Sequence, residues 1–449
     1  MTPPTASPIK PRTMPGVLEL LPLEQVAFDG MIDVIRHEFE RFGYLPIATP
    51  TMELTEVLLR KSGGETERQV YLVQSTGSAQ QGGEPDLAMR FDLTVPLARY
   101  VAEHEHKLSF PFRRYQIQPV YRGERPQKGR YREFFQCDID VVGRNELSLR
   151  YDAEIPAVIN AVFAALDFGE FVIKMNNRRL LAGLLDHFGI QARTEALREL
   201  DKLEKRGPAA VTDSLTKVGA RPDAAEELVS LVGRDGRSGS DALTMLEHLK
   251  GDNALLKRGI EEMREVLQRV GNLGVPPERF ALDLSIARGL DYYTGTVYET
   301  TLVSHPELGS ICSGGRYDDL ASEYTKARLP GVGISIGLSR LFWQLQQAGL
   351  VATDKSTIDV LVGLLDEAGL SEALGMAADL RAAGFNVESV LEPDRIGNQL
   401  KYASRSGINY YVVAGEEERG RSQVLVRDLG SEAQQVVNRH DLVATVAGT

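Results

Sequence analysis

The stretch YRGERPQKGRYREFFQCDID at residues 121–140 decides the fold of this chain, because it joins a basic segment to an alternating strand pattern. Residues 121–132 carry five basic side chains and one acidic one, although the whole chain has a formal net charge of −12. The preceding FRRYQIQPVYRGE and the following EFFQCDIDVVG both predict strands. Together they indicate a β-hairpin with a long basic tip.

One face of the second predicted strand is polar. Alternate residues of a strand share a face, and here these are Phe134, Gln136, Asp138 and Asp140, with Arg132 before them. An aromatic ring, an amide and a carboxylate in line could hold a base and a small cationic ligand. The alternative is a solvated charged loop above a buried strand. Buried carboxylates are costly unless they are paired, so the polar face favours a binding site.

The arginines of the hairpin suit phosphate chemistry. A guanidinium donates two parallel, charge-assisted hydrogen bonds, and phosphoryl or nucleotidyl transfer needs such donors where negative charge develops. The chain has no GxxxxGK[ST] motif, and no GxGxxG opens a helix after a strand. The glycines of GVGISIGLSR at 331–340 are interpreted as letting a helix pack closely on a strand. A nucleotide would therefore be held by a sheet and arginines.

The rest of the chain predicts three parts. Residues 1–16 form a flexible, proline-rich lead-in, and residues 17–348 form a mainly antiparallel sheet domain. Amphipathic helix patterns at about 176–270 interrupt this domain as a helical insertion. Residues 355–449 alternate between strand and helix patterns and predict a small α/β domain. The fold class is thus α+β with a separate C-terminal α/β domain.

Composition narrows the functional classes. No window of 18 residues is apolar throughout, so no membrane span is expected. Cys137 and Cys312 are the two cysteines and form no CxxC motif, which argues against structural zinc and fits a cytoplasmic protein. A pI near 5.3 argues against binding nucleic acid by bulk charge, but it allows a local basic surface such as the hairpin tip.

Several motifs in order resemble the class II aminoacyl-tRNA synthetases, and among them the histidyl-tRNA synthetase family. YRGERPQKGRYREFFQCDID is similar to the second class motif, GVGISIGLSR to the third, and RFGYLPIATP at 41–50 to the first, which forms the dimer interface in the family. RFDLTVPLARYVA at 90–102, ARGLDYYTGTVYE at 287–299 and SGGRYDDL at 313–320 resemble the histidine enzyme in particular. The resemblance covers about residues 17–449. It implies the class II catalytic fold and a C-terminal anticodon-binding domain.

The resemblance implies roles in binding ATP. Arg122 would hold the α-phosphate of ATP and the carboxylate of histidine, with Arg288 opposite it as the second catalytic arginine. Glu124 would contact the adenine amino group, and Phe134 would stack under the adenine. Arg340 would cover the other face of the adenine and reach the terminal phosphates. Mg²⁺ would accompany ATP, and no protein ligand for the metal is assigned.

The resemblance also implies a histidine site and an RNA contact. Arg122 and Arg288 would hold the carboxylate of histidine, and six further residues would hold its α-amino group and its imidazole. These are Asp92, Thr94 and Gln136 at the α-amino group, Asp140 and Tyr293 at the imidazole, and Tyr292 in the pocket wall. The tip residues Arg125, Gln127, Lys128 and Arg130 would meet the acceptor end of tRNA(His).

The implied function is ATP-dependent ligation of histidine to tRNA(His) through a histidyl-adenylate, releasing AMP and pyrophosphate. The implied protein is a cytoplasmic homodimer with no membrane partner. The alternative is a histidine-binding regulatory paralogue, a subunit of ATP phosphoribosyltransferase without ligase activity. Such paralogues lack the C-terminal domain and several motif arginines, which this chain keeps. Asp319 and Ser339 depart from the family pattern of Gly and Glu at these positions.

Overall fold

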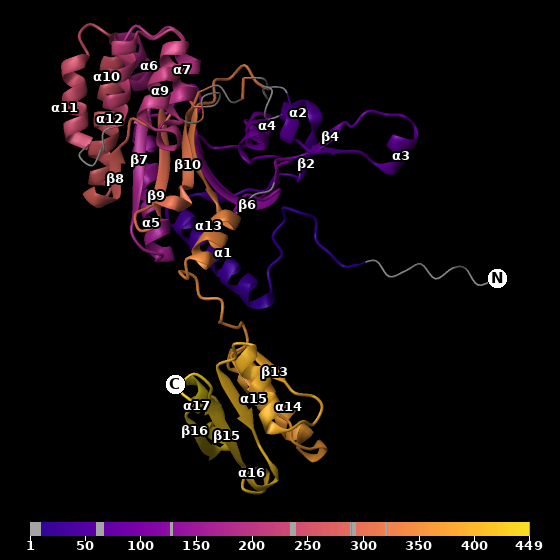
Figure 1. Ribbon diagram of the computed structural model, residues 1–449. Coiled ribbons are helices and arrows are strands. Elements are labelled where there is room, and N and C mark those ends of the chain that lie inside the picture. The colour runs from indigo at the N-terminus through magenta and orange to yellow at the C-terminus, as the bar shows by residue number, and fades with distance from the viewer. Residues whose placement is uncertain are drawn as a thin grey trace. The chain divides into compact units, whose positions relative to one another are not determined.

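The centre of the molecule is an eight-stranded sheet. The computed structural model describes residues 10–59, 67–125, 129–233, 239–287, 289, 293–318, 321–322 and 324–448. Adjacent strands in the sheet follow the order β1 (Leu45–Pro46), β5 (Phe112–Tyr121), β6 (Glu133–Val142), β11 (Gly331–Gly337), β10 (Ser310–Tyr317), β9 (Thr296–Leu302), β7 (Phe171–Asn177) and β8 (Phe280–Leu282). The pairs at the two edges, β1–β5 and β7–β8, are parallel, and the pairs between them are antiparallel. This confirms the predicted, mainly antiparallel core (Figure 1).

The predicted hairpin is formed by β5 and β6, each ten residues long. Its register pairs Arg114 with Asp140 and Gln116 with Asp138, so these side chains share a face. The opposite face packs on the C-terminal part of α1 (Pro22–Arg41) and on α5 (Arg150–Leu166). Tyr115 donates a hydrogen bond to Glu40 of α1 at 2.7 Å, and Arg113 pairs with Glu154 of α5 at 2.6 Å. The sheet therefore has one helix-covered face and one polar face.

A small arm precedes the hairpin. Its strands are β2 (Met52–Leu54), β3 (Leu72–Val73) and β4 (Leu87–Met89), and its helices are α2 (Thr55–Leu59), α3 (Thr76–Gln80) and α4 (Thr94–His104). The fully buried Arg90 joins this arm to the hairpin, because it donates to the carbonyl oxygens of Thr49 at 2.6 Å and Pro119 at 2.9 Å. Pro96 lies in the first turn of α4, where its missing N–H costs no helical hydrogen bond.

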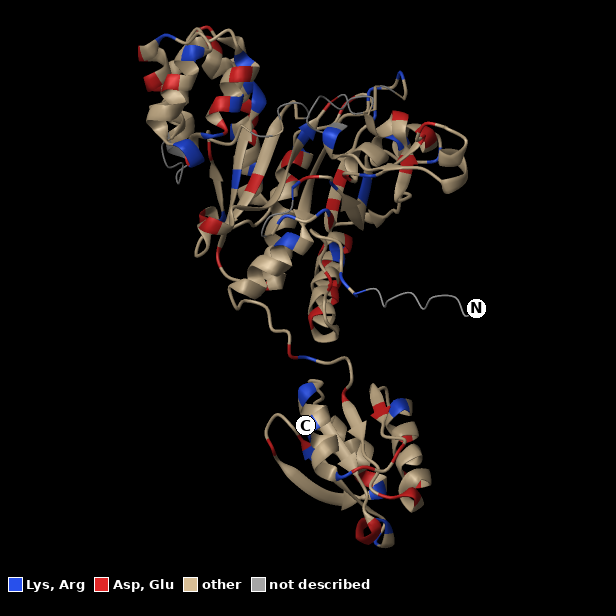
Figure 2. Cartoon of the chain, turned by 45° about the vertical axis from the view of Figure 1, so that its right-hand side comes forward, with Lys and Arg blue, Asp and Glu red and all other residues tan. Residues whose placement is uncertain are grey.

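A helical insertion lies between β7 and β8. Its helices are α6 (Arg178–His187), α7 (Arg193–Leu200), α8 (Leu203–Arg206), α9 (Pro208–Lys217), α10 (Pro222–Val232), α11 (Gly239–Leu249) and α12 (Ala254–Asn272). Two glycines let α6 and α12 cross closely, since a Cβ on Gly183 would lie 2.5 Å from the backbone of Leu256, and one on Gly259 would lie 2.5 Å from that of Leu180. Basic and acidic residues are interspersed over these helices (Figure 2). Residues 176–177, predicted as helical, end β7 instead.

Residues 19–31 and 349–449 form a second compact unit. Its five-stranded sheet has the order β13 (Val387–Ser389), β12 (Val360–Val362), β14 (Tyr410–Val413), β15 (Gln423–Asp428) and β16 (Gln434–Asn438). The helices that follow residue 349 in this unit are α14 (Leu370–Ala382), α15 (Ile396–Arg405), α16 (Glu416–Gly420) and α17 (Leu442–Ala447). The predicted C-terminal α/β fold is therefore confirmed, whereas the exact domain boundaries stay predictions. None of the helices described in either unit is long and apolar enough to cross a membrane.

Candidate active site

A cavity of about 400 Å³ opens beside the basic hairpin. It lies between the hairpin, strands β10 and β11, and the helix α13 (Leu338–Gln347). Six of the residues predicted for the site line it: Arg122, Glu124, Arg130, Phe134, Gln136 and Arg340. Residues from distant parts of the sequence thus share one cavity. It combines an aromatic ring, an amide and several guanidinium groups, which suits a nucleotide.

Arg122 directly follows β5, and contacts with the backbone and with an aromatic ring orient its side chain in this cavity. Its backbone N–H donates to the carbonyl of Arg132 at 2.7 Å, and its Nε donates to the carbonyl of Phe91 at 3.0 Å. Its guanidinium carbon lies 5.0 Å from the centre of the Phe134 ring, in a cation–π contact. Among the described residues, no hydrogen bond or ion pair engages its two terminal nitrogens. Arg122 is therefore oriented with donors left for a ligand.

The rim of the cavity carries the other predicted nucleotide residues. Glu124 pairs with Arg130 at 3.6 Å, and Arg340 donates to the carbonyl of Leu308 at 3.0 Å. Gly129 is in the left-handed region at φ +70°, with the ring of Trp343 3.2 Å from where its Cβ would be. The tip thus turns against α13. Arg125 is exposed, whereas Gln127 and Lys128, both predicted to contact RNA, lie outside the described residues.

A buried acidic cluster lies deeper on the same face of the sheet. We use the name "acidic cluster" for Asp92, Asp138 and Asp140, which are close enough to act on each other's charge. Arg114 is fully buried and forms an ion pair with Asp140, and Tyr317 donates to the same carboxylate at 2.9 Å. Asp92 accepts a hydrogen bond from the backbone N–H of Val95, at 3.0 Å, in the first turn of α4. Three carboxyl groups lie around one buried cation, so a ligand with a positive charge would find acidic partners beyond the one that Arg114 already pairs with.

Gln136 links the cavity to the acidic cluster. Its amide nitrogen donates to the hydroxyl of Ser335 at 2.7 Å, and Ser335 also hydrogen-bonds Asp138. Within the described part of the chain, Gln136 Oε1 and Asp138 Oδ1 are buried without a hydrogen-bond partner. Buried acceptors of this kind are costly unless a ligand supplies donors. The two oxygens therefore mark a place for a group with several N–H donors, such as an ammonium.

Burial makes the acidic cluster hard to ionise. It raises the pKa of Asp138 to about 7 and that of Asp140 to about 6, against the opposing effect of Arg114. Burial also raises the pKa of Asp92, and it raises the pKa of Tyr293 with the nearby carboxylates adding to the effect. A bound cation would lower the pKa of each of these carboxyls, because the cation stabilises the charged form. Tyr293 stays a neutral phenol that can donate or accept a hydrogen bond.

Glycines on β10 and β11 make room for this cluster. A Cβ on Gly333 would lie 2.3 Å from Asp140 Oδ1, and one on Gly331 would lie 2.4 Å from the ring of Tyr317. A Cβ on Gly315 would lie 2.8 Å from the ring of Tyr293. The interpretation of GVGISIGLSR as a helix-packing motif is thus wrong at positions 331 and 333. These glycines accommodate the pocket side chains.

Some predicted residues are placed less completely. Thr94 begins α4 beside Asp92, and Tyr293 packs against Gly315, whereas Arg288 and Tyr292 lie outside the described residues. Asp319 lies outside them as well. Ser339 accepts a hydrogen bond from the backbone N–H of Phe135 at 2.9 Å and so joins α13 to β6. No group of three or more metal-ligating side chains is found in the described portion of the chain.

Sequence reasoning gave no role to Arg114, Ser335 and Tyr317, and it placed Asp138 on the polar face without assigning it a group of the ligand, although all four lie at the acidic cluster. Asp138 had a usable signal, because it alternates with Gln136 and Asp140 on one strand. The SGGRY motif contains Tyr317, but the sequence does not indicate that the side chain of this tyrosine points toward Asp140. Arg114 and Ser335 become visible only when the strand register places them opposite Asp140 and Asp138.

Comparison with known proteins identifies the two parts of the chain. Residues 16–341 match the family model described as histidyl-tRNA synthetase, and residues 357–449 match the model described as anticodon binding domain. The chain is 56% identical over 458 aligned positions to a histidine–tRNA ligase of Xanthomonas campestris pv. campestris (strain 8004), covering 98% of this chain and 96% of the relative.

Solved structures agree with the sequence comparison. The crystal structure of histidyl-tRNA synthetase from Nostoc sp. PCC 7120 is similar with a TM-score of 0.89 at 39% identity, covering 98% of this chain and all of that one. A structure from Bacillus halodurans C, titled as an ATP phosphoribosyltransferase regulatory subunit/histidyl-tRNA synthetase, has a TM-score of 0.73 at 22% identity, covering 91% of this chain and 100% of its own. At that identity the second likeness shows the fold alone.

Proposed function

The chain belongs to the histidyl-tRNA synthetase family and ligates histidine to tRNA, and from this premise we propose that it does so through a histidyl-adenylate formed from histidine and ATP. The observation that carries the proposal is the link made by Gln136. On one side of it lies the arginine-lined cavity, and on the other the acidic cluster. A nucleotide in the first and a histidine in the second would meet at Gln136 and Arg122.

In the proposed first step, a carboxylate oxygen of histidine attacks the α-phosphorus of ATP. A new P–O bond forms, the bond to the β-phosphate oxygen breaks, and pyrophosphate leaves. Arg122 neutralises the charge that builds up on the α-phosphate, with Arg288 proposed opposite it, while Phe134 and Glu124 hold the adenine. Arg340 binds the other face of the adenine and the terminal phosphates. The histidine carboxylate is already ionised, so positioning and charge stabilisation suffice without a general base.

The acidic cluster recognises the amino acid in this proposal. Asp92, Thr94 and Gln136 bind the α-ammonium. We add Asp138, which shares a strand face with Gln136 and whose Oδ1 has no hydrogen-bond partner among the described residues. Asp140 and Tyr293 bind the two imidazole nitrogens, and Tyr292 closes the pocket. An imidazole carries one donor and one acceptor when neutral, so a carboxylate and a phenol can read both ends. Buried polar partners of this kind reject analogues that lack the matching groups.

In the proposed second step, the 3′-hydroxyl of the terminal tRNA adenosine attacks the activated carbonyl. The ester bond to the tRNA forms, the bond between the carbonyl carbon and the phosphate oxygen breaks, AMP leaves with that oxygen, and the hydroxyl proton is released to solvent. The hairpin tip, with Arg125, Gln127, Lys128 and Arg130, would hold the acceptor end, and the C-terminal domain would contact the anticodon. That domain has nine basic and fifteen acidic residues from position 351 onward, so its RNA contacts would be local.

Mg²⁺ enters in this proposal as part of the nucleotide substrate. Among the described residues that line the cavity Glu124 is the acidic one, and the proposal places it at the adenine. Mg²⁺ keeps several waters and is held mainly by substrate phosphates, so it needs no cluster of protein carboxylates. The metal would neutralise phosphate charge, and no protein ligand is assigned to it.

We also propose a cytoplasmic homodimer. Both cysteines are buried free thiols, which suits a reducing compartment. The segment similar to the first class motif and the arm after it expose large apolar side chains: Leu45, Met52, Leu54 and Leu72 are 64%, 49%, 45% and 53% exposed. A second copy of the chain would cover them. The regulatory alternative gains no support, because the relatives at 55–56% identity are named as ligases.

The test of the proposed function is pyrophosphate exchange into ATP, measured with each amino acid in turn. We expect exchange with histidine and not with the others, and we expect Arg288→Ala to abolish it through loss of charge stabilisation at the α-phosphate. A folded wild-type protein that binds histidine but shows no exchange would overturn the adenylate mechanism.

The raised pKa of Asp138 predicts how histidine binding depends on pH. Below its pKa of about 7 the carboxyl is protonated and no longer attracts an ammonium, so binding strengthens as the pH rises. Between about pH 6 and about pH 8 this group alone should strengthen binding roughly tenfold. We expect Asp138→Asn to lose that part of the change in titration calorimetry. The ligand's own imidazole titrates identically in both proteins, so equal pH profiles would contradict the role of Asp138.

A further inference from the structure

The junction between β7 and α6 holds a segment of the histidine pocket. We use the name "junction" for residues 176–179, with the sequence NNRR. The buried Asn176 donates through its amide to the carbonyl oxygens of Leu284 at 3.2 Å and Ile286 at 2.9 Å. These two carbonyls precede the ARGLDYYTG motif. The junction therefore fixes the chain where it enters that motif.

Arg178 holds both sides of the same motif. Its Nη1 donates to the carbonyl of Ala287 at 3.1 Å, and its Nε contacts the carbonyl of Tyr293 at 3.4 Å. Its backbone N–H donates to the carbonyl of Gly295 at 2.9 Å. One residue thus bridges positions 287, 293 and 295. A planar guanidinium can reach two carbonyls at fixed spacing, which a lysine ammonium on a flexible stem cannot do as well.

Glu262, a residue of the helical insertion, accepts hydrogen bonds from two side chains of the junction. Glu262 of α12 is 7% exposed and accepts hydrogen bonds from Asn177 at 3.0 Å and from Arg179 at 2.9 and 3.0 Å. Arg258 contributes a third donor at 3.0 Å. Asn177 caps the start of α6, because its side chain accepts from the backbone N–H of Arg179 at 2.8 Å. Glu262 is thus the shared acceptor of Asn177 and Arg179, two of the four junction residues.

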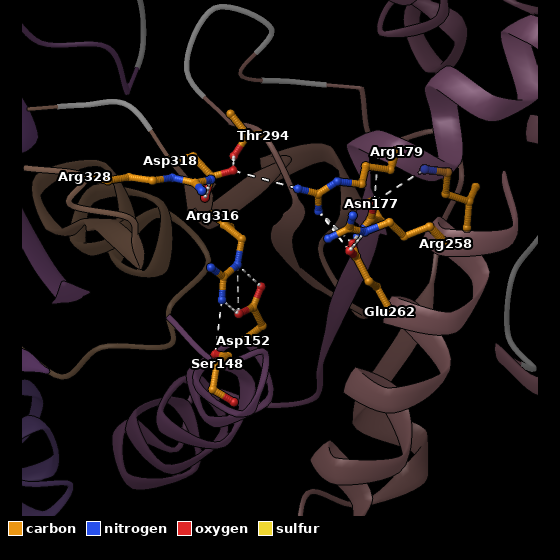
Figure 3. A network of polar contacts seen from close by, with 11 residues as sticks. Ser148, Asp152, Asn177, Arg179, Arg258, Glu262, Thr294, Arg316, Asp318 and Arg328 are labelled. Carbon is orange, nitrogen blue, oxygen red and sulfur yellow. Dashed lines mark hydrogen bonds and ion pairs between the residues drawn. The ribbon is translucent and has the colours of Figure 1, made fainter. Parts of the chain in front are cut away.

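Arg179 also faces the end of β10. Figure 3 shows Arg179 between Glu262 and Asp318. Its Nη2 lies 3.8 Å from Asp318 Oδ2. Asp318 accepts a hydrogen bond from Thr294 at 2.8 Å, and Thr294 directly follows Tyr293 in the chain. The contacts therefore run from α12 of the insertion to the residue beside the pocket tyrosine.

We propose that the junction, held in place by Glu262, positions the histidine pocket: it fixes the main chain on both sides of residues 287–293 and thereby the place of Tyr293. Glu262 and Arg178 act as positioning residues, since neither lies at the acidic cluster or in the cavity. This proposal rests on the proposed function in that Tyr293 is taken to read the imidazole. It also gives the insertion a part in binding the amino acid.

The test compares two neighbouring glutamates on α12. Glu262→Gln removes the charge that gathers Arg179, Arg258 and Asn177, whereas Glu261→Gln changes an exposed side chain next to it. We expect Glu262→Gln to weaken histidine binding about tenfold by titration calorimetry, and to raise the KM for histidine equally in pyrophosphate exchange. The KM for ATP should change less than about twofold. Glu261→Gln should match the wild type.

A second variant guards against a loss of folding. Arg178→Lys keeps the positive charge but removes the planar guanidinium that reaches two carbonyls, so it should weaken histidine binding about tenfold. The far-ultraviolet circular dichroism of this variant should match that of the wild type. Unchanged histidine binding in both folded variants would overturn the positioning proposal, as would equal losses for histidine and ATP. Wild-type protein that binds histidine without exchange would count against the adenylate mechanism alone, because the binding constants still decide the positioning role.

Discussion

The substitution Arg122→Ala should lower the rate of histidine-dependent pyrophosphate exchange by about 10²–10³-fold, the loss typical of one donor removed from a developing charge. Arg122 is oriented by its Nε contact to the carbonyl of Phe91 and by the ring of Phe134, and its terminal nitrogens face no partner among the described residues. Its loss removes charge-assisted donors from the proposed α-phosphate position. The exchange rate at saturating histidine and ATP measures this loss directly.

Arg144→Ala is the matched control for this experiment. Arg144 lies just beyond the far end of β6, pairs with Glu105 at 3.0 Å, and has a side chain that is 45% exposed. Removing an exposed ion pair costs little, so its exchange rate should stay within about twofold of the wild type. An Arg122→Ala protein that keeps its circular dichroism and exchanges within about threefold of the wild type would show that the α-phosphate is bound elsewhere.

The hairpin shows how much of the fold can be predicted from the sequence. Strand residues alternate between faces, so the residue pattern alone indicates that Phe134, Gln136, Asp138 and Asp140 form one polar face. The ten-residue strands β5 and β6 confirm it. The antiparallel core and the C-terminal α/β unit are predictable for the same reason, since both follow from local periodicity.

The partners of that polar row are not predictable in the same way. Arg113 and Arg114 are adjacent and chemically equal, yet Arg113 pairs with Glu154 behind the sheet while Arg114 pairs with Asp140 in front of it. Only the register between strands decides which arginine reaches the site. The predicted start of α6 is wrong for a related reason: Asn176 and Asn177 fit a helix start by pattern, but tertiary contacts to Leu284 and Glu262 hold them at the end of β7.

The substitution Gly333→Ala should lower kcat/KM for histidine by about 10²-fold, because a small displacement of a binding group has effects of this size. The new methyl carbon would lie 2.3 Å from Asp140 Oδ1 and 2.2 Å from the carbonyl oxygen of Ile139. Either Asp140 rotates away from Arg114 and Tyr317, or β6 and β11 move apart. Both changes disturb the proposed imidazole partner. Steady-state pyrophosphate exchange at varied histidine and at varied ATP would locate the effect.

Gly271→Ala is the control that makes this result specific to the pocket. Gly271 lies near the end of α12, and a Cβ there would meet no atom within 4 Å, so an alanine should leave exchange unchanged and favour the helix slightly. If Gly333→Ala bound histidine like the wild type, the space beside Asp140 would not be needed for the amino acid. If histidine and ATP were affected equally, the methyl group would be acting through the sheet as a whole. A loss concentrated on histidine would instead show that the glycine keeps Asp140 in place for the imidazole. Gly333 pairs with Asp140, whereas Gly337, at the far end of β11, lines the cavity proposed for the nucleotide.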